Sequence, residues 1–275
     1  MYGRAHRTVG LTLIEMTLVV ATIALLMGLA LPAVRAMINS FQSEGGTKSI
    51  IHAALNSART MAVTRQRYVG VRFQKACRSD ALTAPLKGLL DAPQYMVFIV
   101  HEERKVLDLA NGFRALEGQE PIRLPDMIGV MDLTGVKNDA DMDELREVCN
   151  ATTFSIVFSP SGKLTIQEVQ VRNKNGYVDS TNNTDVSLDD IFNKKLQVDA
   201  GLALFYQDDY FGAGWSGYPD LGLRPESSCT SFVLYDRRTF RRAYERGKAW
   251  SDHLRELSIR PVYVSPYTGD LISAQ

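Results

Sequence analysis

Residues 9–16 read Val9-Gly10-Leu11-Thr12-Leu13-Ile14-Glu15-Met16, and the apolar run that follows them decides the expected fold. From Met16 to Val34, 19 consecutive residues carry no charge and are mostly Leu, Val, Ala, Ile and Met. A helix that rises ~1.5 Å per residue would cross most of a ~30 Å hydrocarbon core with such a run. An acid at the edge of the run is costly in lipid, so Glu15 indicates a functional role.

The residues around this stretch form a recognisable pattern. A basic leader with Arg4 and Arg7 ends in Gly10, and Glu15 is the fifth residue after that glycine. This pattern resembles the N-terminus of type IV pilins and type II secretion pseudopilins, although Phe or Met is commoner at the position of Leu11. The resemblance implies that prepilin peptidase cuts between Gly10 and Leu11 and that Leu11 is then N-methylated. It also implies that Pro32 bends the helix.

Two other interpretations of the same stretch stay open. A secretory signal peptide has a basic start, but its apolar region is only about 7–15 residues long and a small-x-small cleavage site follows it. An uncleaved anchor would explain the length and the leader charges, but it gives no reason for Gly10 followed by Glu15. The pilin-like interpretation accounts for all of these features.

The same resemblance implies roles in assembly. Glu15 would neutralise the α-amino group of Leu11 in a neighbouring subunit, because two opposite charges buried together cost less than either alone. Ala24 and Gly28 are four residues apart, a spacing of small residues that lets apolar helices approach closely. Small residues are also simply common in membrane helices, so this pair remains a candidate packing site.

Composition and charge bound the remaining possibilities. The 275 residues contain 31 basic and 31 acidic side chains, so the overall charge does not indicate a nucleic-acid partner. The leader arginines predict a cytoplasmic N-terminus, with the residues after Pro32 exported. We therefore expect a single-pass inner-membrane protein with a periplasmic C-terminal domain that later enters a pilus or pseudopilus. Cys77, Cys149 and Cys229 would then lie in an oxidising compartment, and the sequence leaves open whether two of them pair.

The rest of the chain predicts a helix followed by short strands. Apolar residues at helical spacing continue to about residue 67, with a bend or short break at Gly45-Gly46, and strands are expected near residues 68–73, 95–100, 153–158, 163–172 and 230–235. Phe158, Pro160 and Gly162 are similar to a turn of the GspH/FimT pseudopilin subfamily. Asp236 is a candidate cap for a helix that runs to about Leu257, and a terminal hairpin is expected over residues 261–272.

The expected fold is α+β and pilin-like. A long N-terminal helix, membrane-spanning in its first half, would pack on an antiparallel β-sheet domain with an additional C-terminal helix. The expected divisions are a leader (1–10), a membrane or filament-core helix (11–34), the continuation of that helix (35–67) and a β-rich periplasmic domain (68–275). Residues 173–225, which are polar and then rich in glycine and aromatic residues, are expected to be a variable insertion in this domain.

The expected function is assembly and not catalysis. We expect a minor pilin-like subunit whose partners are prepilin peptidase, other subunits, the assembly platform and, before assembly, inner-membrane lipid. The scattered histidines and the absence of Walker, dinucleotide or H-E-x-x-H motifs predict no enzyme, cofactor or metal. One alternative is a pilin that binds DNA or a surface, for which Arg238, Arg241 and Arg242 would supply the phosphate contacts. A membrane-anchored periplasmic enzyme is the other alternative.

Overall fold

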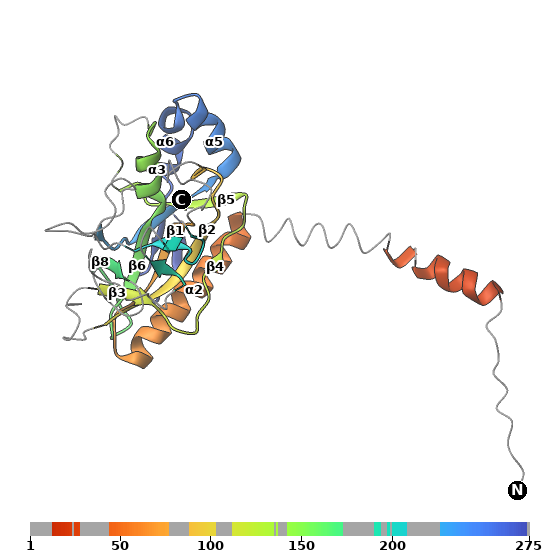
Figure 1. The fold of residues 1–275 in the computed structure, drawn as a ribbon, viewed down its shortest axis with the longest axis horizontal. Coiled ribbons are helices and arrows are strands. Elements are labelled where there is room, and N and C mark those ends of the chain that lie inside the picture. Colours follow the sequence, from red (N-terminus) through yellow and green to blue (C-terminus); the bar gives the residue numbers. More distant parts are fainter. Residues whose placement is uncertain are drawn as a thin grey trace, which may run out of the picture.

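The computed structural model describes residues 13–23, 25–27, 44–76, 88–102, 112–134, 136, 142–172, 190–193, 197–198, 200–207 and 226–273. Within these residues the chain forms an eight-stranded mixed sheet, a four-stranded antiparallel sheet and a two-stranded parallel ladder. One long helix crosses the larger sheet, and the short helices lie together at one end of the domain (Figure 1).

The larger sheet is built around β1, which pairs with an antiparallel neighbour on each side. Its strands are β1 (Val69–Lys75), β2 (Gln94–His101), β3 (Gly112–Ala115), β4 (Ile122–Arg123), β6 (Phe154–Phe158), β7 (Leu164–Thr165), β8 (Glu168–Arg172) and β11 (Glu226–Ser227). The order is β11-β8-β3-β2-β1-β6-β7, and β4 pairs with β2 beyond the end of β3. Strands β3 and β8 are parallel, so the sheet is mixed.

Helix α2 (Glu44–Arg65) covers one face of this sheet. Its inward positions recur at helical spacing and are mostly small, which lets the helix lie close to β1 and β6. They pack against the alternate apolar residues of the strands, among them Val71 and Ile156. The buried residues of α2 are Thr47, Ile51, Ala54, Leu55, Ala58 and Ala62.

The smaller sheet completes the same core and carries the short helices. Its strands are β5 (Ile128–Met131), β12 (Ser231–Asp236), β13 (Val262–Val264) and β14 (Leu271–Ser273). A second apolar cluster joins it to α3 (Leu145–Thr152), α5 (Arg237–Glu245), the π-helix η3 (Trp250–Leu254) and α6 (Arg255–Ser258). The face of the larger sheet opposite α2 packs against Phe192 of β9 (Phe192–Asn193) and Phe205 of β10 (Phe205–Tyr206).

The expected fold class is wrong. The residues of the N-terminal apolar helix that are described, 13–23 and 25–27, form a short helix with exposed side chains. The large sheet is curled and mixed, because β8 joins β3 in parallel after the chain has passed through β4, β5, α3, β6 and β7. Local alternation of apolar residues predicts a strand without fixing the direction of its neighbour, so the sequence does not predict the parallel pairing of β3 and β8.

The expected single-pass inner-membrane localisation is also wrong. None of the helices formed by the described residues is both long enough and apolar enough to cross a bilayer.

Several individual elements agree with the sequence. The strands expected near residues 68–73, 95–100, 153–158 and 230–235 are β1, β2, β6 and β12, and the terminal hairpin is β13–β14. Asp236 caps α5, because its carboxylate accepts a hydrogen bond from the Thr239 N–H at 2.7 Å. The expected single helix to Leu257 is divided instead, since α5 ends at Glu245 and Gly247 adopts a left-handed φ of +68°.

Candidate functional site

The residues expected to guide processing and assembly are only partly described. Gly10, Leu11, Ala24, Gly28 and Pro32 lie outside the described residues. Glu15 lies in the helical segment 13–23, where its side chain is exposed.

The described part of the apolar helix, residues 13–23 and 25–27, presents an uncovered hydrocarbon surface. Leu13 is 81% exposed and Leu18 is 64% exposed, and the other large apolar side chains of the segment are also exposed. The hydroxyls of Thr17 and Thr22 donate to the Ile14 and Val19 carbonyls at 2.9 and 2.8 Å. Both hydroxyls are thus satisfied within the helix. Glu15 is the only charged residue in the sequence from residue 13 to residue 27.

One of the three α5 arginines that the sequence offers for phosphate contacts is already ion-paired. Arg238, Arg241 and Arg242 are all exposed, but Arg241 is paired with Asp91 at 2.6 Å and with Glu245 at 2.8 Å. The hydrogen bond to Glu245, with the Asp91 charge beside it, raises the pKa of Arg241. The α5 surface is therefore weaker as a phosphate site than the sequence suggested, because a paired guanidinium would have to leave its carboxylates.

The two described cysteines are separate thiols. Cys149 and Cys229 are both free and buried, whereas Cys77 lies outside the described residues. The Cys229 thiol donates to Asp132 Oδ2 at 2.8 Å. Burial raises the pKa of Cys149 to about 11, and burial together with the Asp132 carboxylate raises the pKa of Cys229 further. Both thiols are consequently poor nucleophiles in the folded chain.

One histidine and one acid, His52 and Asp270, are in contact. His52 Nε2 lies 3.0 Å from Asp270 Oδ1 and 3.0 Å from Asn56 Nδ2. The hydrogen bonds from His52 and Thr268 lower the pKa of Asp270. Both contacts are made by Nε2, so this nitrogen is not aimed at a serine or cysteine as that of a general base would be.

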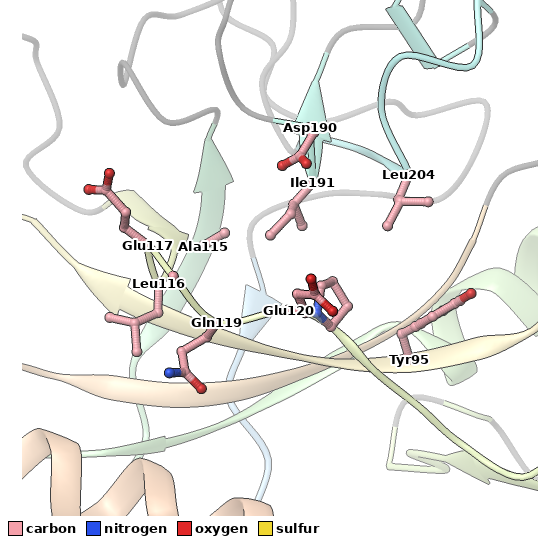
Figure 2. Close-up of a pocket in the computed structure, with 11 residues that line it drawn as sticks. Tyr95, Ala115, Leu116, Glu117, Gln119, Glu120, Asp190, Ile191 and Leu204 are labelled. Atoms are coloured by element: carbon pink, nitrogen blue, oxygen red, sulfur yellow. The ribbon is translucent and has the colours of Figure 1, made fainter. Parts of the chain in front are cut away.

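A hollow that sequence reasoning missed lies between the β3–β4 loop and the segments that precede β9 and β10. We call it the acidic hollow; its volume is 510 Å³, and Glu117, Glu120 and Asp190 supply its charges. Figure 2 shows Asp190, Ile191 and Leu204 projecting toward the loop, with Tyr95 and Glu120 on the opposite wall. The Leu204 N–H donates to the Asp190 carbonyl at 3.2 Å, which ties that wall together.

A second hollow lies at the C-terminal end of α2. We call it the basic hollow; its volume is 390 Å³, and Arg65, Arg67, Val100, Glu102, Arg114, Ala115, Leu116 and Glu117 line it. Arg114 is 8% exposed and forms an ion pair with Glu102. No local motif marks either hollow, because each is lined by segments far apart in the sequence: 65–67, 100–102 and 114–117 in the basic hollow, and 95, 115–121, 190–191 and 204 in the acidic hollow.

Comparisons with profiles of known protein families, with curated proteins and with solved structures find no match. No family evidence therefore supports the expected assignment to pilins or to a secretion system.

Proposed function

We propose that the chain is a structural subunit of a pilin-like filament, cut between Gly10 and Leu11 and assembled through the helix that follows. The observation that carries this proposal is the exposed apolar surface of residues 13–23 and 25–27. Burying exposed apolar surface against a partner is favourable, and a contiguous exposed apolar patch is typical of an interaction site. The same helix of another copy offers an apolar surface that can cover it.

The single charge of that helix also supports assembly. A carboxylate covered by apolar side chains is costly unless a cation accompanies it. By the resemblance to pilins, the cation is the methylated α-amino group of Leu11 in a neighbouring copy. The proposed partners are accordingly a prepilin-type peptidase and further pilin-like subunits.

Processing is tested by intact mass and N-terminal sequencing of the chain co-expressed with a prepilin-type peptidase. We expect a mature chain that starts at methylated Leu11, and we expect Gly10→Ala to leave the leader attached. A matched control is Gly3→Ala, which changes a glycine of the leader away from the cleavage point. A wild-type chain that keeps Met1, or normal cleavage of the Gly10→Ala variant, would overturn the proposal.

A further inference from the structure

The turn that ends α2 brings two arginines to the basic hollow. Gln66 follows Arg65, the last residue of the helix, and has a left-handed φ of +54°. The next N–H, that of Arg67, donates to the Ala62 carbonyl at 3.2 Å, as in a Schellman cap. Gln66 Nε2 donates to the Val63 carbonyl at 2.7 Å. The helix end is therefore closed by one backbone N–H and one amide, and neither arginine uses its guanidinium for the cap.

The conformation of this turn is uncommon for the residue that adopts it. Glycine enters the left-handed region readily, whereas a side chain such as that of Gln66 makes it unfavourable. Backbone strain of this kind persists where the surrounding structure fixes it, and it is frequent at functional sites. Here the strained turn sets Arg65 and Arg67 in the lining of one hollow.

The two guanidinium groups are available to a ligand. Arg65 and Arg67 are both exposed, and neither forms an ion pair or a side-chain hydrogen bond with any residue that the structure describes. Arg241 of α5 differs, because two carboxylates already hold it. An anion that enters the basic hollow therefore has no carboxylate to displace from Arg65 or Arg67.

The floor of the hollow is rigid and nearly neutral. Arg114 of β3 is 8% exposed, and it forms an ion pair with Glu102, whose side chain is 17% exposed. Val100, the register partner of Arg114 in β2, lies beside this pair in the lining. The lining as a whole has three arginines and two glutamates, which leaves one positive charge. Since the buried pair is balanced, Arg65 and Arg67 supply this surplus.

The remaining acid marks the boundary with the acidic hollow. Ala115, Leu116 and Glu117 line both hollows, so the two hollows adjoin along this part of the β3–β4 connection. Figure 2 shows the side chains of Leu116 and Glu117 pointing in opposite directions. Arg65 and Arg67 line the basic hollow alone. An anion is consequently attracted to the side formed by the end of α2 and repelled from the side shared with the acidic hollow.

We propose that the basic hollow binds a small organic phosphate monoester, with Arg65 and Arg67 as the ligands of its phosphate group. Guanidinium groups bind phosphate oxygens through paired, charge-assisted hydrogen bonds. A phosphate monoester carries about −1.5 to −2 charges at pH 7, which matches two free guanidinium groups.

The size and the remaining lining of the hollow favour an organic ester over a bare phosphate ion. Its volume of 390 Å³ lies within the range of about 300–1,000 Å³ that is usual for small-molecule sites. Val100, Ala115 and Leu116 give it apolar wall against which the carbon part of the ester can pack. This inference goes beyond the proposed function, because it concerns the sheet domain and requires no assembly.

The test is isothermal titration calorimetry of the full chain with ethyl phosphate, in a phosphate-free buffer at low salt with a mild non-ionic detergent. We expect wild-type chain to bind ethyl phosphate. Diethyl phosphate, which has a single negative charge and fewer free oxygens, should bind at least about tenfold more weakly, as expected from the loss of one charge-assisted hydrogen bond.

Two sets of variants assign the binding to the hollow. Arg65→Gln/Arg67→Gln should weaken the binding of ethyl phosphate at least about tenfold and keep the wild-type circular dichroism spectrum, because both side chains are exposed. Glu117→Gln removes the negative charge at the boundary and should tighten binding severalfold. The matched control is Arg255→Gln/Arg260→Gln, which changes two exposed arginines outside the lining and should bind as wild type does.

Several outcomes would overturn the inference. They are a wild-type chain that does not bind ethyl phosphate, equal binding of ethyl and diethyl phosphate, wild-type affinity in Arg65→Gln/Arg67→Gln, an equal loss in the control, or weaker binding by Glu117→Gln. None of them bears on the proposed function, since cleavage after Gly10 is measured separately by intact mass and N-terminal sequencing.

Discussion

The side chain of Gln94 is bonded to the backbone of Val130 in both directions, as a strand neighbour would be. Gln94 Nε2 donates to the Val130 carbonyl at 2.8 Å, and the Val130 N–H donates to Gln94 Oε1 at 2.9 Å. Nε2 also donates to the Thr152 carbonyl at 2.9 Å. One buried amide therefore joins β2 of the larger sheet to β5 of the smaller sheet and to the end of α3.

We predict that Gln94→Met lowers the free energy of unfolding by about 2–4 kcal/mol. The replacement has a similar volume, but it leaves three buried backbone groups without their hydrogen bonds, and each costs about 1–3 kcal/mol before the structure relaxes. Urea unfolding monitored by circular dichroism measures the change. The control Gln119→Met alters an exposed glutamine and should stay within about 0.5 kcal/mol. Equal stability of the two variants would contradict this role for Gln94.

The aromatic ring of Tyr235 packs directly over the backbone of Gly129, its register partner in β5. A Cβ added at residue 129 would overlap Cζ, Cε1 and the hydroxyl oxygen of that ring. We predict that Gly129→Ala destabilises the fold by about 1–3 kcal/mol through overpacking. Thermal unfolding of Gly129→Ala, Tyr235→Leu and the double variant checks the cause. The double variant should lose less free energy of unfolding than the two single variants lose together. If the two losses simply add, the overlap between the Cβ and the ring is contradicted.

How much of this arrangement the sequence predicts depends on whether the signal is local. The apolar alternation of β1, the cap at Asp236 and the β13–β14 hairpin are encoded in a few neighbouring residues, and they were predicted. The bond between Gln94 and Val130 joins residues 36 positions apart, and no pattern around Gln94 indicates it. The basic hollow also depends on contacts that no local pattern encodes, because Arg114 meets Glu102 only once β3 has paired with β2.

The apolar run from Met16 to Val34 is a local signal, but the fold class predicted from it is wrong. Its composition predicts a membrane-spanning helix that continues to about residue 67 with a bend or short break at Gly45-Gly46, but composition does not say how the domain that follows is built. The described residues place one helix at 13–23 and 25–27 and begin α2 at Glu44, with Gly45 and Gly46 in its first turn. The ion pair of Arg241 with Asp91 is not visible in a local pattern either, since the two residues are 150 positions apart in the sequence.

Lys75 is a buried base that should make stability depend on pH. Its Nζ donates to the Leu89 and Leu90 carbonyls at 2.8 and 3.2 Å, and Arg237 donates to the same Leu90 carbonyl at 3.2 Å. Burial, followed by the nearby Arg237 charge, lowers the pKa of Lys75 from 10.5 to about 7.

We predict that the free energy of unfolding gains a rising contribution from Lys75 between pH 7 and pH 10. In that interval the unfolded chain binds a proton that the folded chain has released, so raising the pH favours the folded state by up to about 1.4 kcal/mol per pH unit. Urea unfolding of wild type and of Lys75→Met at several pH values isolates this contribution. Lys248→Met removes an exposed lysine and should keep the wild-type slope. A Lys75→Met variant with the wild-type slope would contradict the shift.

The hydrogen bond between Cys229 and Asp132 predicts a selective change in thiol reactivity. We expect both described thiols to resist iodoacetamide at pH 8 in the folded chain, because the thiolate is the reactive form and both pKa values are raised. Asp132→Asn removes the carboxylate charge that disfavours the Cys229 thiolate, so it should speed alkylation of Cys229 severalfold. Peptide mapping by mass spectrometry reads both sites, with Cys149 as the internal control. Equal acceleration at both cysteines would indicate general loosening and not a local charge effect.

The last prediction concerns Glu15, the only charge in the exposed helix. We predict that Glu15→Val leaves cleavage after Gly10 intact and lowers incorporation into filaments at least about tenfold. The reason is that the α-amino group of Leu11 in a neighbouring copy would then be covered without a counter-charge, which costs about 3–5 kcal/mol for a fully buried pair and less for a partly hydrated one. Co-assembly of tagged variant and wild-type chains, quantified in sedimented filaments, measures this. Thr17→Val is the matched control, because the Thr17 hydroxyl is already satisfied by the Ile14 carbonyl and its loss should not disturb packing. Normal incorporation of Glu15→Val would show that the acid does not contribute to assembly.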